Sequence, residues 1–153
     1  MLQVFQKFIN LQAAAIHRTA NVKVLVGSWS EASQTDAFGF TNFYSDECLI
    51  AAGGDVLGTL DYNEMHCYDV GGVYSPTAPF RHNATSYKLS KPLIIGEFSQ
   101  SGGAGWTTQQ QYTYLLQNGY AGAWGWQATG GGTDSDGLLT LSKGIHAAAL
   151  ANT

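Results

Sequence analysis

The first candidate for a catalytic group is a carboxylate at the predicted end of a short apolar strand. Glu97 follows the apolar run Leu93 to Ile95, which lies between Pro92 and Gly96. Such runs suit a strand covered on both faces, as in a parallel α/β sheet. An ionisable group at the carboxyl end of that strand is costly to bury without partners or a function. Glu97 is therefore either a catalytic carboxylate or an ordinary glutamate in a surface loop.

Further polar and aromatic side chains stand at the ends of other strand-like runs. Side chains two residues apart in a strand point the same way, so each run has members that share a face. These sets are Tyr62, Glu64, His66 and Tyr68; Ile95 and Glu97; and Trp124 and Trp126. If the faces line one cavity, a carboxylate, an imidazole, a phenol and an indole meet near its mouth. They could hold a sugar, with the carboxylate attacking and the indole stacking on the ring. Each could also be a structural residue, and we expect Trp124 in the core.

The elements that would position these side chains alternate between strands and helices. Four strand-like runs start roughly 30 to 40 residues apart, which leaves room for a helix after each. The runs are 21–29, 60–69, 91–99 and 119–127, and the predicted helices are 1–19, 41–52, 107–118 and 137–150. Thr107 or Thr108 would cap the third helix, and Gly119 would end it. The first helix has an apolar stripe of Val4, Phe5, Phe8, Ile9 and Leu11. The connection 71–89 is expected to be mostly loop.

The composition narrows the class of partner. The chain is 44% hydrophobic and 12% charged, with a net charge of −4, so it has no basic footprint for nucleic acid or an anionic membrane. No run is long enough to span a bilayer. The opening residues read as an amphipathic helix and not as a signal peptide.

Two further features concern the cysteines and a glycosylation sequon. Cys48 and Cys67 lack the spacing of a zinc site, so we expect free buried thiols or a disulfide between them or to a segment outside the chain. Asn83-Ala84-Thr85 is a glycosylation sequon in a polar loop, which is a weak indication of secretion.

The chain resembles the C-terminal half of an endo-β-1,4-mannanase of glycoside hydrolase family 5, of the invertebrate digestive type. The Ile95-Gly96-Glu97-Phe98 motif is shared with other sugar hydrolases, and it is more specific when combined with His66-x-Tyr68 upstream and Trp126-Gln127 downstream. The matching segments are 26–30, 48–50, 65–69, 91–100, 102–105 and 122–128. The resemblance implies an α/β fold, namely strands five to eight of a partial (β/α)8 TIM barrel with their helices. Residues 1–153 would then be one piece of a catalytic barrel.

The same resemblance implies roles for five residues. Glu97, at the end of strand seven, matches the catalytic nucleophile. His66 and Tyr68, on strand six, match the pair that flanks it, with the tyrosine hydrogen-bonded to the nucleophile. Trp126, on strand eight, matches the aromatic floor of the subsite that holds the sugar to be cleaved. Trp29, at the end of strand five, is expected to line the cleft.

The implied reaction is a retaining double displacement, which needs a second carboxyl group about 5–5.5 Å from the nucleophile. The family's acid/base glutamate follows an asparagine at the end of strand four, which is expected before Met1, so this chain would lack it. Asn63-Glu64 reproduces that pair. However, Glu64 lies two residues before His66 and so ~6.6 Å deeper at ~3.3 Å per residue. We expect Glu64 to pack in the barrel interior, either hydrogen-bonded or protonated.

The expected partners of the parent enzyme are a β-mannan and the missing N-terminal half of the barrel, in an extracellular setting. No metal and no organic cofactor are implied. Two other functions stay open. One is a β-1,4-glucanase of the same family, which would share the same site residues. The other is a sugar-binding half-barrel without catalysis.

Overall fold

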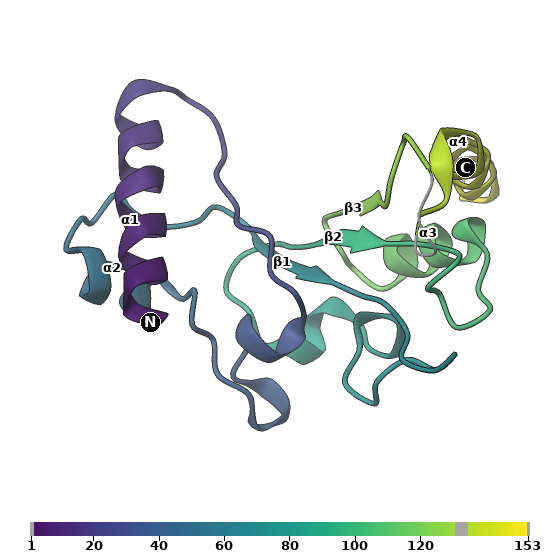
Figure 1. Cartoon of the computed structure of the whole chain (residues 1–153), viewed down its shortest axis with the longest axis horizontal. Helices are drawn as coiled ribbons and strands as arrows, with labels where there is room; N and C mark the ends of the chain where they lie inside the picture. Colours follow the sequence, from purple (N-terminus) through teal and green to yellow (C-terminus); the bar gives the residue numbers. More distant parts are fainter. Residues whose placement is uncertain (1, 131–134, 153) are drawn as a thin grey trace.

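A three-stranded parallel sheet lies at the centre of the fold in the computed structural model of this chain, which describes residues 2–130 and 135–152. The strand order is β1-β2-β3, and neighbouring strands are parallel (Figure 1). The strands are β1 (Asn63–His66), β2 (Leu93–Phe98) and β3 (Gly122–Gly125). The connection from β2 to β3 contains an α-helix, which is the βαβ arrangement that the sequence predicts, whereas β1 and β2 are joined by a segment with 3-10 turns alone.

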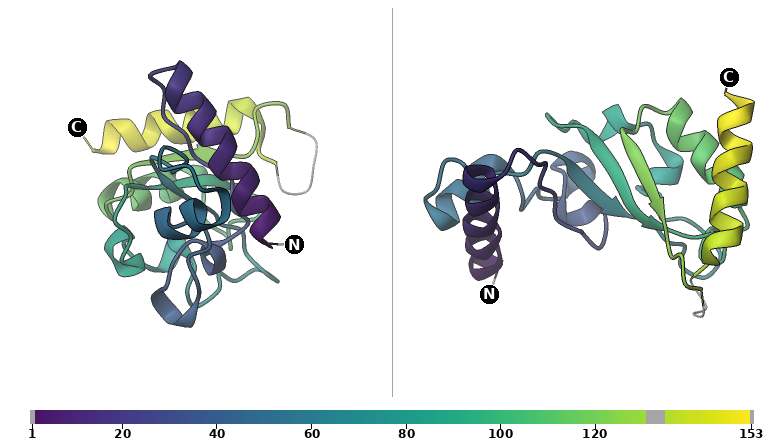
Figure 2. Two further views of the ribbon diagram at one scale, coloured as in Figure 1. Left: turned by 90° about the vertical axis from the view of Figure 1, so that its left-hand side faces the viewer. Right: turned by 90° about the horizontal axis from the view of Figure 1, so that it is seen from above.

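Within the described residues, four α-helices accompany the sheet, each overlapping a predicted helix. They are α1 (Leu2–Thr19), α2 (Asp46–Gly53), α3 (Thr108–Gln117) and α4 (Gly137–Ala151). Met1, which the sequence places in the first helix, lies outside the described residues. Helices α1 and α2 lie at one end of the molecule and α3 and α4 at the other, which Figure 2 shows clearly. Single 3-10 turns occupy Glu31–Ser33, Ala37–Gly39, Pro79–Arg81 and Ala84–Tyr87.

The limits of the helices follow local hydrogen bonding. Thr107 and Gln110 form a reciprocal capping box at the start of α3, and Gly119 follows its end with a φ of +78°. Helix α2 begins at Asp46 and not at residue 41. The reason is that the Asn42 side chain accepts the N–H of Tyr44, 3.0 Å away, and Ser45 then caps the helix. An asparagine that bonds its own backbone favours a turn over a helix.

The first predicted strand, residues 21–29, does not form a strand. Its backbone is bonded to the β1 segment by two hydrogen bonds, from Asp61 N to Val24 O and from His66 N to Ser28 O. The N–H of Val24 donates to the Asp61 carboxylate, and that of Ser28 donates to the Glu64 carboxylate. Side-chain oxygens thus take two amides that a regular ladder would use. The segment is extended beside β1 without becoming a fourth strand.

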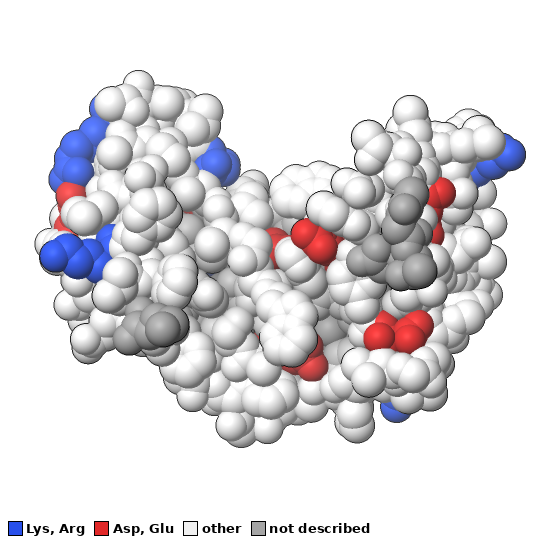
Figure 3. Space-filling model, in the orientation of Figure 1, with Lys and Arg blue, Asp and Glu red and all other residues white. Residues whose placement is uncertain are grey.

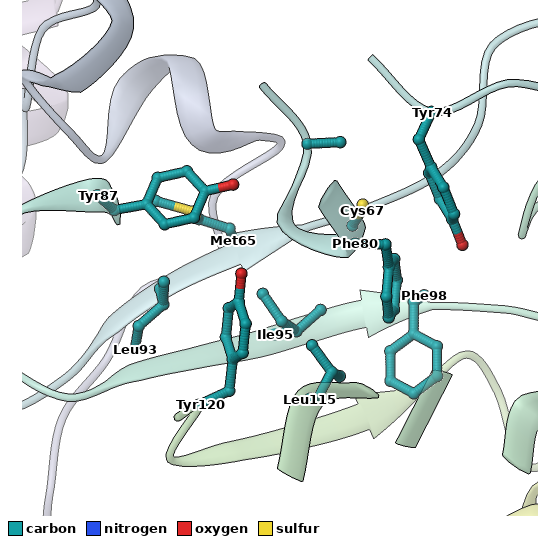
Figure 4. Close-up of a cluster of buried hydrophobic side chains, with 11 residues drawn as sticks. Met65, Cys67, Tyr74, Phe80, Tyr87, Leu93, Ile95, Phe98, Leu115 and Tyr120 are labelled. Carbon is teal, nitrogen blue, oxygen red and sulfur yellow. The ribbon is translucent and has the colours of Figure 1, made fainter. Parts of the chain in front are cut away.

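The hydrophobic core lies on one face of the sheet, under α3 and the 71–89 segment. Figure 4 shows aromatic rings from that segment meeting Met65, Ile95 and Phe98 of the strands. The hydroxyl of Tyr120, just before β3, joins the two layers by donating to Pro79 O, and that of Tyr87 donates to Thr77 O within the 71–89 segment. The long connection is therefore mostly irregular, as predicted, but it is held by buried rings. Burial of such rings contributes most of the stability of this part of the fold.

The two cysteines are free thiols in the structure. Cys67 is buried in the core cluster, and Cys48 is half-buried on α2. Among the helices of the described residues, none is long and apolar enough to cross a bilayer.

Helix α1 packs on α2 and buries two polar residues, Gln6 and Asn10, with two alanines, while most of its apolar stripe stays uncovered. Asn10 is fully buried and bonds the backbone of Asp55 and Gly58. Side chains of the stripe are exposed instead, with Phe8 at 61%. The other exposed apolar side chains of α1 are Leu2, Val4, Phe5 and Leu11. An apolar helix face of this extent marks a contact surface.

A histidine joins α1 to the segment that leads into β1. Nδ1 of His17 lies 2.8 Å from Leu57 O, and Nε2 lies 3.0 Å from the Asp61 carboxylate. The bond to Leu57 and then the contact with Asp61 raise the pKa of His17 above its ordinary value. Burial opposes the ionisation of Asp61, but the Val24 N–H, Lys23 and His17 outweigh it and lower the pKa of Asp61 to about 2.

This link should make stability depend on pH in a defined direction. A raised pKa means that protonated His17 stabilises the fold fully below its unfolded pKa of about 6.5 and loses that effect as the pH rises through the folded value. We expect the coupling energy in a double-mutant cycle of His17→Gln and Asp61→Asn to be largest at about pH 5 and to fall toward zero at about pH 9. Urea unfolding measures it. Equal coupling at both pH values would contradict the assignment.

Candidate active site

A β-bulge at the end of β2 sets the direction of Glu97. Met65 pairs with Ile95, but the next pair is His66 with Glu97, so Gly96 is the extra residue. Ile95 is fully buried in the core, whereas the Glu97 side chain is 27% exposed and contacts His66. The sequence-based expectation that Ile95 and Glu97 share a face is wrong, because one inserted residue inverts the alternation of the strand.

Gly96 is required by the packing of a second carboxylate. A Cβ atom at this position would lie 1.6 Å from Oε1 and 2.8 Å from Cγ of Glu64. Glu64 is 1% exposed and accepts a hydrogen bond from the N–H of Ser28. Glu64 thus lies in the interior and is hydrogen-bonded, as the sequence analysis expected. Its carboxylate occupies the space above the Gly96 backbone.

Glu97 meets His66 and Tyr68 at one oxygen. The hydroxyl of Tyr68 donates to Oε2 of Glu97 over 3.2 Å, and Nδ1 of His66 lies 3.3 Å from the same atom. The structure therefore brings together three of the five site residues that the sequence singles out. The period-two spacing of His66 and Tyr68 placed both on the Glu97 side of the sheet, while Met65 and Cys67 face the core.

The imidazole of His66 lies between two carboxylates. Its Nε2 is 3.1 Å from Oε1 of Glu64, on the side away from Glu97. Burial would by itself lower the pKa of His66, but the contact with Glu64 and the negative charges of Glu64 and Glu97 together raise it. A positive charge on this ring would attract the Glu97 carboxylate, whose Oε2 lies 3.3 Å from Nδ1.

A pocket of about 400 Å³ opens beside this cluster. Trp29 is 89% exposed at its rim, and Glu31 is buried in its wall, where it accepts hydrogen bonds from Ser75 and Thr77. The lining residues include Trp29, Glu31, His66, Tyr68 and Asp69. Figure 3 shows the molecule hollowed between its two ends, with acidic side chains exposed near the middle of the hollow. Trp29 therefore shares a pocket with His66 and Tyr68.

Trp126 follows β3, next to the end of β2. Its N–H donates to Phe98 O over 2.7 Å, which fixes its backbone beside the residue that follows Glu97. The indole is half-buried. Trp124, which we expected in the core, is 53% exposed. Ala123 packs against the core instead, so Trp124 projects from the opposite face of β3. Among the described strands, β3 pairs with β2 alone.

Two aspartates that the sequence analysis missed hold the loops around the site. Asp69 accepts the N–H groups of Gly72 and Ala104. Asp136 accepts those of Gln100 and Ser101, in the loop after β2. Their only sequence signal is a carboxylate near glycine-rich loops, which is common on protein surfaces. Among the described residues, no group of three His, Cys, Asp or Glu side chains could hold a metal ion.

The chain is similar to known proteins in its sequence and in its fold. No family model matches the chain. It is 42% identical over 128 residues to the mannan endo-1,4-beta-mannosidase of Mytilus edulis, covering 83% of this chain and 35% of that protein. It is 41% identical over 143 residues to the protein of the same name from Cryptopygus antarcticus, covering 92% and 37%. The crystal structure of endo-1,4-beta-mannanase from Eisenia fetida matches with a TM-score of 0.93 at 48% identity, over 95% of this chain and 41% of that one.

The parallel sheet together with these matches defines the class of fold: the chain folds as part of a β/α barrel like that of the β-mannanases it matches. More particularly, it is a homologue of the invertebrate β-1,4-mannanases. It spans between 35% and 37% of the length of the two relatives compared by sequence.

Proposed function

We propose that the extended segment 21–29 and strands β1 to β3 take the places of strands five to eight of a family 5 β-mannanase barrel and that Glu97 is its nucleophile. The observation that carries the proposal is the arrangement at Glu97, whose Oε2 is held by Tyr68 at 3.2 Å and lies 3.3 Å from His66. Catalytic groups of a β/α barrel lie at the carboxyl ends of its strands. The names of the relatives favour mannan over β-1,4-glucan as the substrate.

In the proposed reaction, Glu97 attacks the anomeric carbon of a β-1,4-linked mannose and forms a glycosyl ester. Tyr68 and His66 both engage Oε2, so Oε1 is the oxygen left to form the new bond. A second carboxylic acid, contributed by barrel segments outside residues 1–153, protonates the leaving oxygen and then activates water. Trp126 forms the apolar floor for the sugar, and Trp29 lines the cleft beside it.

Exposed apolar surfaces at both ends of the chain support the need for further barrel segments. Helix α1 exposes its stripe at one end, and α4 exposes Leu138, Leu139, Ile145 and Leu150 at the other. Edge strands and apolar faces of this kind invite pairing or aggregation when left uncovered. We propose that the remaining half of the barrel packs on these two faces. We also expect the isolated chain to form oligomers or to be poorly soluble.

A chimera tests this function. The chain would replace the matching 41% of the Eisenia fetida enzyme, which supplies the rest of the barrel. We expect hydrolysis of mannan by the chimera, little on carboxymethyl cellulose, and none by the isolated chain, because protonation of the leaving group contributes ~10²–10⁴-fold. A soluble monomer of the chain that cleaves mannan would contradict the half-barrel interpretation. A chimera that cleaves only cellulose would contradict the substrate.

We propose an extracellular setting for the parent enzyme, and Asn83 offers a test. Asn83 is exposed and begins a 3-10 turn, in which its Oδ1 accepts from Ser86 and Thr85. The chimera expressed in a secreting eukaryotic cell should carry a glycan at Asn83, which mass spectrometry detects. Thr85→Ala, which destroys the sequon, should abolish it. An unmodified Asn83 in secreted protein would weaken the extracellular assignment.

A further inference from the structure

Glu64 has no part in the proposed reaction, yet its side chain is 1% exposed, less than that of His66 or Glu97. Its Oε2 accepts the Ser28 N–H, but the buried Oε1 has no aligned hydrogen-bond donor among the described residues. A buried carboxylate oxygen without a donor costs free energy unless a cation compensates it. The group that lies next to Oε1 is Nε2 of His66, at 3.1 Å.

The same ring reaches Glu97 with its other nitrogen, at 3.3 Å. Glu64, His66 and Glu97 therefore form a continuous row of carboxylate, imidazole and carboxylate across β1 and β2. The backbone leaves room for this row at Gly96, where a Cβ would lie 1.6 Å from Oε1 of Glu64. Such close packing holds the Glu64 carboxylate at one distance from the imidazole.

We propose that Glu64 is a positioning residue that, through His66, keeps a positive charge against Oε2 of Glu97. This role rests on the proposed function, because the positive charge serves a nucleophile that attacks the sugar as a carboxylate. Glu64 does not touch the substrate and acts only through the imidazole. A glutamate, unlike a glutamine, brings the negative charge that favours a protonated ring.

The charged and titratable groups that face His66 are few. Glu64 lies beside it on β1, Glu97 on β2, and Tyr68 follows on the chain after β1. Glu31, from the segment after Trp29, lines the same pocket as His66, but its carboxylate is bonded to Ser75 and Thr77. Glu31 is therefore a matched control, as a buried carboxylate near the ring that does not contact it.

The test measures the protonation of His66 directly in the chimera with the Eisenia fetida enzyme, because the isolated chain is expected to form oligomers or to be poorly soluble. Diethyl pyrocarbonate acylates neutral imidazole, so the pH dependence of modification, followed for each histidine by peptide mass spectrometry, gives a midpoint for His66. We expect Glu64→Gln to lower this midpoint and to make modification at pH 7 several-fold faster. Glu97→Gln should lower it as well, and Glu31→Gln should leave it unchanged.

Two results would overturn the proposal: the same midpoint in the wild type and Glu64→Gln, or an equal shift with Glu31→Gln. Far-UV circular dichroism first establishes that each variant keeps its helices and sheet. If Glu64→Gln unfolds, Glu64→Asp replaces it, and its more distant carboxylate should lower the midpoint by a smaller amount. No sugar enters the measurement, so a failure to hydrolyse mannan would count against the proposed function and leave this result standing.

Discussion

Glu97→Gln in the chimeric barrel is expected to lower kcat on mannan at least ~1000-fold, which corresponds to about 4 kcal/mol of barrier. The amide is nearly isosteric with the carboxylate and can still accept the hydrogen bond from Tyr68, so the fold should remain. It cannot form the glycosyl ester, so the first displacement fails. Steady-state release of reducing sugar, together with circular dichroism of the same samples, measures both effects.

Glu64→Gln is the matched comparison, because it makes the same change one strand away. Glu64 is buried beneath His66 and cannot reach the glycosidic bond. The loss of kcat caused by Glu64→Gln should therefore be far smaller than that caused by Glu97→Gln. It should also change the pH profile, since Glu64 acts through His66. If Glu64→Gln abolished activity while Glu97→Gln spared it, the assignment of the nucleophile would be wrong.

The second large effect is expected on stability, from Gly96→Ala. The added methyl would fall within 1.6 Å of the Glu64 Oε1 atom, and the carboxylate is held in place by Ser28 and packed against His66. Overpacking of this kind costs ~1–3 kcal/mol, and displacing a buried carboxylate from its partners adds to the loss. We expect the urea midpoint of the chimera to fall and mannanase activity to fall with it.

Gly122→Ala is the control for this variant, since it adds the same methyl to β3 in the same sheet. A Cβ there would lie 3.7 Å from Ile94, which is an ordinary contact, so stability should change little. A Gly96→Ala protein as stable as Gly122→Ala would show that Glu64 does not occupy the space above Gly96. The packing of the Glu64 carboxylate would then not explain the β-bulge at Gly96.

Periodic and capping signals made much of the fold predictable from the sequence. Thr107 and Gly119 set the ends of α3 as expected, and the alternation of His66 and Tyr68 with core residues placed both beside Glu97. These signals are local, because each depends on neighbours in the chain. The contacts around Glu97 followed from them once the strands paired in parallel.

What the sequence could not predict depends on contacts between distant residues. The bulge at Gly96 reversed the facing of Glu97 relative to Ile95, and its cause is the Glu64 carboxylate on another strand. The segment 21–29 has a strand pattern, but Asp61 and Glu64 take amides of its backbone. The exposure of Trp124 could not be predicted, because the apolar pattern of a strand does not say which of its faces is covered.

The most direct test of the central claim is to find the residue that becomes covalently attached to the sugar. A mechanism-based fluoromannoside with a good leaving group traps the glycosyl–enzyme ester of a retaining enzyme, and peptide mass spectrometry of the labelled chimera locates it. We expect the label on Glu97, with Glu64 free, and no label in Glu97→Gln. An active chimera labelled at another residue, or one that resists labelling altogether, would contradict the claim that Glu97 is the nucleophile.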